Sequence, residues 1–149
     1  MRYTGEKMET GRKTVPVAAA AIILHGKVLA CQRGYGDLKG CWECPGGKLE
    51  KGETGMDAIR REIREELRAE VVPERLLCVL EHDYPAFHLH MEVFLCRPET
   101  GEITLTEHQS ARWLDMDALD GLAWCPADTK ALPALKQCLS DITENPCRE

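Results

Sequence analysis

Three glutamates near the middle of the chain, Glu62, Glu65 and Glu66, have the spacing that most clearly points to chemistry. Side chains three and four positions apart share one face of a helix, so these carboxylates fall within about one third of its circumference. Like charges at that spacing cost about 0.2–0.5 kcal/mol per pair in an isolated helix. Mg²⁺ prefers carboxylate oxygens, and a bound cation would offset the repulsion. The pattern therefore predicts a site for a hard divalent metal ion.

The glutamates end a longer motif that begins with a glycine-rich loop, GGKLEKGETGMDAIRREIREELRA, residues 46–69. This stretch resembles the Nudix box, which that family writes as G-x5-E-x7-R-E-U-x-E-E-x-G-U, where U is aliphatic. Gly47, Glu53 and the run from Arg61 to Leu67 match, which makes seven of the nine defined positions. A solvated helix face could carry REIREEL alone, but it would not require Gly47 and Glu53 upstream.

The resemblance implies a metal site. Members of the family bind Mg²⁺ or Mn²⁺ through the box glutamates and a carbonyl of the glycine pair. Carried over by position, the ligands are the carboxylates of Glu62, Glu65 and Glu66 and the carbonyl of Gly46. The metal would neutralise phosphate charge and lower the pKa of a bound water molecule.

The resemblance also implies roles for neighbouring residues of the box. Arg61 and Glu53 would pair and orient the loop against the helix, and Lys48 would offer a positive charge to phosphate. Arg68 replaces the closing glycine of the box and Ala69 stands at its last aliphatic position. Because glycine takes positive φ at little cost, this replacement leaves the shape of the helix end open.

Two further residues match the MutT branch of the family. The run Trp42–Lys48 looks like the W-E-F-P-G-G-K entry of that branch, with cysteine in place of the aromatic residue. Glu107 occupies the position of a further carboxylate, which adds it to the candidate catalytic residues and metal ligands. Arg33 matches a phosphate-contacting arginine. A surface glutamate and an ordinary charge at a strand end are the simpler interpretations of these two residues.

Pro126-Ala127-Asp128 is the run that bears on recognition of the substrate base. It resembles a P-A-N or P-A-D element of MutT-like enzymes whose last residue contacts the base edge. An ionised Asp128 only accepts hydrogen bonds and so suits an exocyclic amine such as cytosine N4, although oxidised guanine also presents N–H donors. Tyr84 aligns with an aromatic residue of the base pocket and would stack on the base. A helix N-cap for Asp128 and a core position for Tyr84 remain open.

These matches imply a nucleoside triphosphate pyrophosphohydrolase that releases a nucleoside monophosphate and pyrophosphate. Substrates of the 8-oxo-dGTP type would place the enzyme in nucleotide-pool sanitation and DNA repair, and CTP-like substrates are the other option. Glu107 or one of the box glutamates would take the proton from water, and their spacing does not choose among them. The alternatives are hydrolysis of another nucleoside diphosphate derivative and a non-catalytic nucleotide-binding domain.

The elements that must position these residues follow from hydrophobic periodicity. The resemblance implies an α/β fold, a mixed sheet between the box helix and the C-terminal helix (α/β/α). We expect residues 1–14 to form a loose arm and residues 15–145 a single domain. The expected strands are 17–24, 27–33, 42–44, 76–81, 88–96, 103–105 and 110–114, and the expected helices are 54–67 and 129–142 with a capped turn at 115–119.

Composition excludes several classes of protein. The net charge of −6 is a poor basis for binding nucleic acid, so no stable nucleic-acid complex is expected. No apolar run approaches the roughly 18 residues that span a bilayer, and no signal-peptide pattern is seen, which predicts a cytoplasmic protein. Most of the eight cysteines lie in apolar segments, which indicates reduced thiols. Cys41 and Cys44 lack a second ligand pair for structural zinc. The sequence leaves the oligomeric state open.

Overall fold

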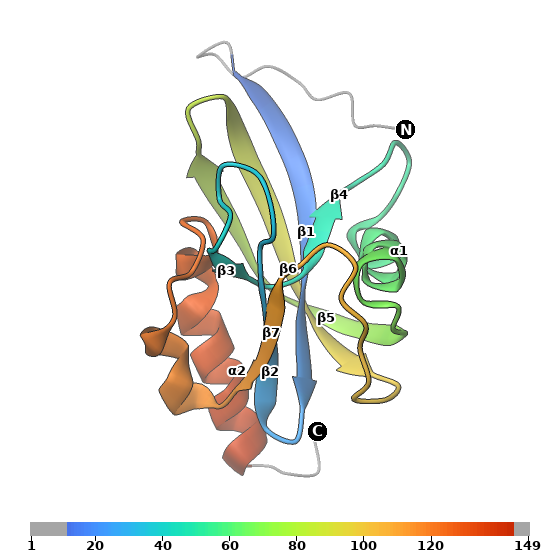
Figure 1. Cartoon of the computed structure of the whole chain (residues 1–149), viewed down its shortest axis with the longest axis vertical. Helices are drawn as coiled ribbons and strands as arrows, with labels where there is room; N and C mark the ends of the chain where they lie inside the picture. The colour runs from blue at the N-terminus through green and yellow to red at the C-terminus, as the bar shows by residue number, and fades with distance from the viewer. Residues whose placement is uncertain (1–11, 145–149) are drawn as a thin grey trace.

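A mixed sheet separates two helices in the computed structural model, which describes residues 12–144 (Figure 1). Within that range the strands form one seven-stranded sheet whose main path runs β3-β2-β1-β6-β5, with β4 paired to β1 and β7 paired to β2. The strands are β1 Lys13–Leu24, β2 Lys27–Gln32, β3 Trp42–Glu43, β4 Gly46–Lys48, β5 Val71–Asp83, β6 Phe87–Pro98 and β7 Ser110–Leu114. The helices are α1 Gly55–Leu67 and α2 Leu132–Glu144, with 3₁₀ helices η1 Met116–Gly121 and η2 Asp128–Ala131. The predicted α/β/α arrangement is confirmed.

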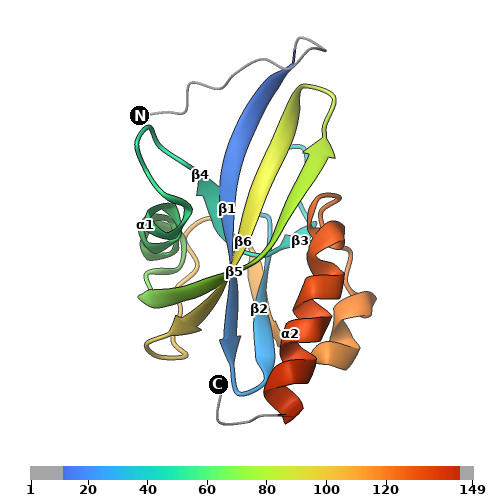
Figure 2. The same ribbon diagram turned by 180° about the vertical axis from the view of Figure 1, so that it is seen from behind.

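Strand β1 lies at the centre and has a buried side chain on each face. Successive side chains of a strand point to opposite faces. Ala18, Ala20 and Ile22 accordingly pack on the α1 side, and the residues between them pack on the α2 side. Figures 1 and 2 show the two helices on opposite sides of the sheet. The small alanine side chains leave room for both layers to approach the sheet.

Strand β1 pairs with β6 along its length, and the two run parallel over ten paired residues from Lys13–Phe87 to Ile22–Cys96. Strand β6 also pairs antiparallel with β5, so these two strands form a long hairpin. The hairpin tip, residues 84–86, therefore lies beside the beginning of β1. This arrangement brings Tyr84 and Phe87 close to the N-terminal residues of β1.

Helix α1 begins and ends as the box sequence requires. Thr54 is its N-cap and forms a capping box with Asp57, since each side chain accepts a hydrogen bond from the other residue's N–H. Buried Ala58, Ile59, Ile63 and Leu67 face the sheet. Arg68 adopts the left-handed conformation with φ 50° and ψ 43°, so the helix ends where the box glycine would end it.

Several predicted boundaries were wrong, and each has a local reason. Strand β1 begins at Lys13 rather than at residue 17, because its polar first residues pair with β6. Strand β5 begins at Val71, although register shifts beside Pro73 and Leu76 interrupt its alternation. Gly46–Lys48 forms β4 through backbone pairing with β1, which no side-chain pattern announces. The C-terminal helix is divided into η2 and α2, and Asp115 caps η1 as predicted for the turn.

Residues 103–105 were predicted to form a strand, and they do not. The backbone N–H groups of Thr104 and Thr106 donate to the carbonyls of Leu67 and Glu66, at 2.8 and 3.1 Å. The Thr106 hydroxyl donates to the carbonyls of Glu65 and Glu66, at 2.9 and 3.1 Å. The last carbonyls of a helix have no partner within it, and this segment supplies one.

Most of the predicted arm, residues 1–11, lies outside the described residues, and the single domain of residues 15–145 stays a prediction. No helix in the described part is long and apolar enough to cross a membrane. Among the described cysteines, Cys31, Cys41, Cys44, Cys78, Cys96 and Cys125 are free thiols.

Candidate active site

One cleft of about 550 Å³ opens between α1, the sheet and the loops on the α2 side. That volume is in the range of small-molecule sites. Ten of the eleven predicted site residues line it, from elements far apart in the sequence, and Glu53 stands behind the wall. The lining residues that were predicted are Arg33, Gly46, Lys48, Arg61, Glu62, Glu65, Glu66, Tyr84, Glu107 and Asp128.

The Arg61 side chain connects the acidic residues on the α1 side of the cleft. Its Nε and a terminal nitrogen donate to both carboxylate oxygens of Glu53 at 2.8 and 2.9 Å, and a further bond of 3.0 Å reaches the Lys48 carbonyl. Its other terminal nitrogen donates to Glu62 at 2.8 Å and to Glu65 at 3.3 Å. Arg61 thus joins the loop, β4 and the glutamates. The Arg61 guanidinium keeps the pKa of Glu53 below its usual value.

The acidic end of the cleft fits a cation. Burial, followed by repulsion from Glu62, Glu43 and Glu107, raises the pKa of Glu66 to about 9. One carboxylate oxygen of Glu66 is buried and has no hydrogen-bond partner among the described residues. A divalent ion would relieve both costs, since it supplies positive charge and takes carboxylate oxygens. Gly47 leaves space for Glu62 here, because a Cβ on Gly47 would lie 2.5 Å from its carboxyl carbon.

Gly46, next to Gly47, is also constrained by the atoms around it. A Cβ on Gly46 would overlap the Ala18 carbonyl oxygen and lie 2.8 Å from the Ala19 Cα. Only glycine therefore allows β4 to approach β1 at this point. The close approach places the predicted carbonyl ligand, Gly46, in the cleft wall.

Ligand atoms of Glu43, Cys125 and Asp128 lie within 4.8 Å of one another, and within the described range no other such group of three occurs. The box glutamates share the cleft but not this close convergence. Two observations argue against a cation among these three residues. Arg33 already neutralises Glu43, and burial raises the pKa of the Cys125 thiol, which keeps it protonated. The box glutamates therefore stay the predicted metal ligands.

Glu107 lies at the cleft, as the sequence predicted. The exposed Tyr35 donates its hydroxyl hydrogen to a Glu107 carboxylate oxygen at 3.2 Å, and the Arg33 guanidinium lies 5.6 Å from the centre of the Tyr35 ring. The negative charge of Glu107, followed by burial, raises the pKa of Tyr35. Tyr35 therefore connects a predicted phosphate contact with a predicted proton acceptor.

Asp128 lies at the other end of the cleft and is 6 % exposed. Its Oδ2 accepts the Cys44 N–H at 3.0 Å. Burial raises the pKa of Asp128 to about 8; Cys44 opposes the shift and Glu43 adds to it. The sequence argument assumed an ionised carboxylate, whereas burial of Asp128 favours the protonated form. A protonated carboxyl both donates and accepts, so the argument for cytosine from charge alone is lost.

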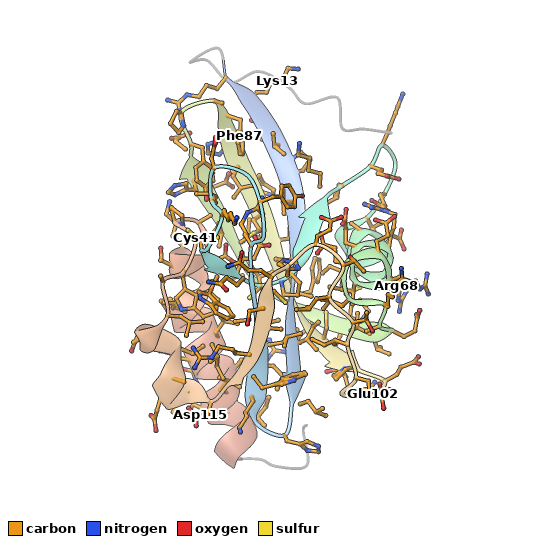
Figure 3. All side chains as sticks on the ribbon, viewed as in Figure 1. Lys13, Cys41, Arg68, Phe87, Glu102 and Asp115 are labelled. Atoms are coloured by element: carbon orange, nitrogen blue, oxygen red, sulfur yellow. The ribbon has the colours of Figure 1, made fainter. Side chains whose placement is uncertain are left out.

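Tyr84 is half-buried and lines the cleft. Its hydroxyl accepts the Ala127 N–H at 3.3 Å, and its ring lies 5.3 Å from that of Phe87. Tyr84 thus fixes the residue before Asp128 and still offers its ring to the cleft. Figure 3 shows Phe87 near the hairpin tip, on the side of Cys41 and away from Arg68 and Glu102. Apolar Val15, Val17, Leu89 and Met91 continue this wall.

Tyr35 and Glu43 are among the cleft residues that received no role from the sequence. The Glu43 carboxylate accepts from Arg33 at 3.2 Å through one oxygen and contacts the His108 ring at 2.9 Å through the other. Glu43 stands inside the quoted WECPGGK run, so its place in the motif was the available signal. Tyr35 had none, because it lies in a glycine-flanked loop without periodicity.

Known proteins share this fold and this sequence pattern. A family model described as the NUDIX domain matches residues 14–135. An 8-oxo-dGTP diphosphatase of Proteus vulgaris is 37 % identical over 95 residues, which cover 62 % of this chain and 85 % of that protein. A CTP pyrophosphohydrolase of Escherichia coli is 31 % identical over 123 residues, covering 82 % and 91 %. The crystal structure of a MutT NUDIX hydrolase from Burkholderia pseudomallei superposes with a TM-score of 0.70 at 30 % identity, covering 84 % of this chain and 98 % of that one.

Proposed function

The chain belongs to the Nudix hydrolase family, and on that premise we propose that it is a Mg²⁺-dependent pyrophosphohydrolase acting on nucleoside triphosphates. Water attacks the α or the β phosphorus, the bond from that phosphorus to the oxygen that bridges the two breaks, and the products are a nucleoside monophosphate and pyrophosphate. Mn²⁺ would substitute for Mg²⁺, because both are hard cations that take carboxylate oxygens.

One observation carries this proposal: a single cleft has glutamates at one end and a buried carboxyl with an aromatic wall at the other. The glutamate end, with Glu62, Glu65, Glu66 and Glu107, suits phosphates and their cation, and the end with Tyr84 and Asp128 suits a base. A non-catalytic binding domain would not need the complete set of box glutamates. A dinucleotide substrate finds no support in the Pro126-Ala127-Asp128 element.

The residues of the acidic end divide the work between them. When bound at Glu62, Glu65, Glu66 and the Gly46 carbonyl, the cation supplies positive charge against the phosphates. Arg61, held by Glu53, orients the carboxylates, and Lys48 and Arg33 offer further positive charge to the phosphate chain. The proton of the attacking water passes to this carboxylate group, either to a box glutamate or to Glu107.

The base end supports two substrate classes. A neutral Asp128 carboxyl offers one donor and one acceptor, which complements the carbonyl and N–H edge of an oxidised guanine. The same pair complements the amine and ring nitrogen of cytosine. The relatives named as acting on 8-oxo-dGTP and on CTP fit both classes. We place 8-oxo-dGTP first and CTP second. The free thiols of Cys31, Cys44 and Cys96 fit the predicted cytoplasmic location.

A nucleotide panel tests the proposal. Purified protein with Mg²⁺ is given 8-oxo-dGTP, dGTP, CTP and dCTP, and the products are separated and quantified. We expect monophosphate and pyrophosphate in equal amounts. Release of a nucleoside diphosphate and inorganic phosphate would place the cleavage between the β and γ phosphates. Tight binding without turnover of any nucleotide would refute the proposal that the protein is an enzyme.

A further inference from the structure

A buried imidazole stands directly behind the cleft. His108 follows Glu107, and its side chain is 5 % exposed. It does not line the main cleft, but its Nε2 lies 2.9 Å from one carboxylate oxygen of Glu43, which does. Its Nδ1 is buried and has no partner among the described residues. Burying a polar ring costs free energy unless a hydrogen bond compensates for the lost water. The bond to Glu43 is that compensation.

The hydrogen-bond network decides which ring nitrogen carries the hydrogen. The second oxygen of Glu43 accepts from Arg33 at 3.2 Å, so Glu43 is an ion-pair partner and accepts on both sides. Nε2 of His108 must therefore donate. A hydrogen on Nδ1 would be buried without an acceptor, so the hydrogen belongs on Nε2.

Held from both sides, Glu43 lies between the base end of the cleft and its acidic end, where it also neighbours Glu66. Its carboxylate is within 4.8 Å of ligand atoms of Asp128 and Cys125, and its own side chain is 17 % exposed. Arg33 alone would leave one oxygen of Glu43 without a partner. The bond from His108 removes that freedom and fixes the direction in which Glu43 faces Asp128. Its negative charge also supports the raised pKa of Asp128, after burial.

The loop that carries His108 is itself fixed to the sheet. Gln109 N–H donates to the Gln32 carbonyl at 3.0 Å, and a Cβ on Gly34 would overlap the Glu107 carbonyl oxygen. The ring is thus presented to Glu43 from a rigid backbone. Such rigidity is what precise orientation of a carboxylate requires.

We propose that His108 is a positioning residue for base selection, which acts by holding the Glu43 carboxylate beside Asp128. The inference rests on the proposed function, since it concerns which nucleotide the same cleft prefers. The ranking of bases should therefore depend on a side chain that touches no substrate.

Three substitutions separate positioning from packing. In His108→Gln the amide nitrogen reaches the place of Nε2 and can donate to Glu43. His108→Asn is a polar change that is too short to do so, and His108→Leu removes the donor entirely. His25→Asn, in the exposed turn between β1 and β2, is the control. Thermal unfolding of each variant establishes that it is folded.

The measured quantity is the ratio of kcat/KM for 8-oxo-dGTP to kcat/KM for CTP. We expect the wild type, the control and H108Q to agree within about threefold, and H108N and H108L to reduce the preference about tenfold. If all His108 variants lose activity equally on both nucleotides, or if H108Q behaves like H108L, the proposal is overturned.

Two readouts do not depend on turnover. The Kd ranking of non-hydrolysable α,β-methylene analogues of the two nucleotides should follow the same pattern. Nitrogen-15 NMR of the imidazole should place the hydrogen on Nε2, and Glu43→Gln should change that signal. A ring protonated on Nδ1 alone contradicts the positioning role. Absence of turnover with an intact Kd ranking would refute the enzyme and leave the positioning role supported.

Discussion

Arg61 binds Glu53 through two hydrogen bonds, from Nε at 2.8 Å and from a terminal nitrogen at 2.9 Å. Both side chains are mostly buried, with 24 % and 14 % exposed, so the pair is little screened by solvent. The same guanidinium reaches Glu62 on the opposite side. The direction of the proposed metal-binding face is therefore set by a glutamate that does not line the cleft.

Glu53→Gln should weaken this anchor. Loss of a charge-assisted bond of this kind costs about 1.5–3 kcal/mol in the free energy of unfolding. Denaturant unfolding measures the loss, and kcat should fall because Arg61, which also bonds to Glu62 and Glu65, is less firmly positioned. Glu50→Gln is the matched control, since Glu50 is 41 % exposed and 3.8 Å from the Arg61 Nε. That change should cost about 0.5 kcal/mol or less. Equal losses in both variants would show that Glu53 has no special role.

Glu65→Gln should reduce turnover about a hundredfold while leaving the fold intact, because Glu65 is 59 % exposed and is a proposed metal ligand. Chelation of divalent ions should abolish activity, and added Mg²⁺ should restore it. Mg²⁺ should also raise the Tm of the wild type, since it binds the folded state, and should do so less in the variant. Glu70→Gln, which removes an exposed glutamate beyond the helix end, is the control. An unchanged Mg²⁺ effect in E65Q would remove Glu65 from the ligand set.

Asp128→Asn should change base preference more than overall rate. The amide keeps the acceptor for the Cys44 N–H and carries a permanent donor. The ratio of kcat/KM between 8-oxo-dGTP and CTP should shift about tenfold at pH 9, where the wild-type carboxyl is ionised, and less at pH 6.5. Asp115→Asn, at the cap of η1, is the control. An unchanged ranking at both pH values would deny Asp128 a part in base selection.

Asp128 also makes the stability of the protein depend on pH. Its pKa is about 8 in the fold and about 3.9 in an unfolded chain, so between these values the folded state retains a proton that the unfolded state has lost. Stability must therefore fall as pH rises through this window, by at most about 1.4 kcal/mol per pH unit from this residue. Unfolding free energies of wild type and D128N from pH 5 to 9 should diverge, with the variant relatively more stable at high pH. Parallel curves would show that the pKa of Asp128 is not raised in the folded protein.

Arg68→Gly should stabilise the end of α1. Arg68 adopts φ 50°, where a Cβ costs about 1 kcal/mol and glycine costs little. Arg68→Ala is the matched control, because it removes the same charge and keeps the Cβ. Denaturant unfolding should show R68G more stable than R68A by about 1 kcal/mol, with equal activity. If the alanine variant is the more stable one, the left-handed conformation is not the determinant.

Side-chain periodicity predicted those parts of the fold that carry a side-chain signal. The buried stripe of Ile59, Ile63 and Leu67 and the alternation along β6 are of this kind. Strand β4 is not, because Gly46 and Gly47 have no side chains and pair through backbone alone. Ile103 and Leu105 looked like strand residues, but their segment bonds to helix carbonyls. The parallel pairing of β1 with β6 connects residues more than 70 positions apart, which local patterns do not encode.

The candidate site likewise has features that the sequence predicted and features that it could not predict. The motif located the residues of the cleft wall, because a family pattern records position. It did not record environment, so the burial of Asp128 and the second hydrogen bond on Glu43 could not be anticipated. Protonation and orientation follow from what surrounds a group in three dimensions.

The segment of residues 103–106 that binds the end of α1 has a mechanical consequence. Thr106 is tied to the carbonyls of Glu65 and Glu66, and Glu107 is the next residue, so the carboxylates of both segments are carried by one rigid unit. Tyr84 and Phe87 instead belong to the β5–β6 hairpin. Changes at the hairpin tip, residues 84–86, can therefore accumulate without misaligning the hydrolytic groups, whereas the body of the hairpin packs against α1. New substrate ranges become accessible to descendants of this chain while its reaction is preserved.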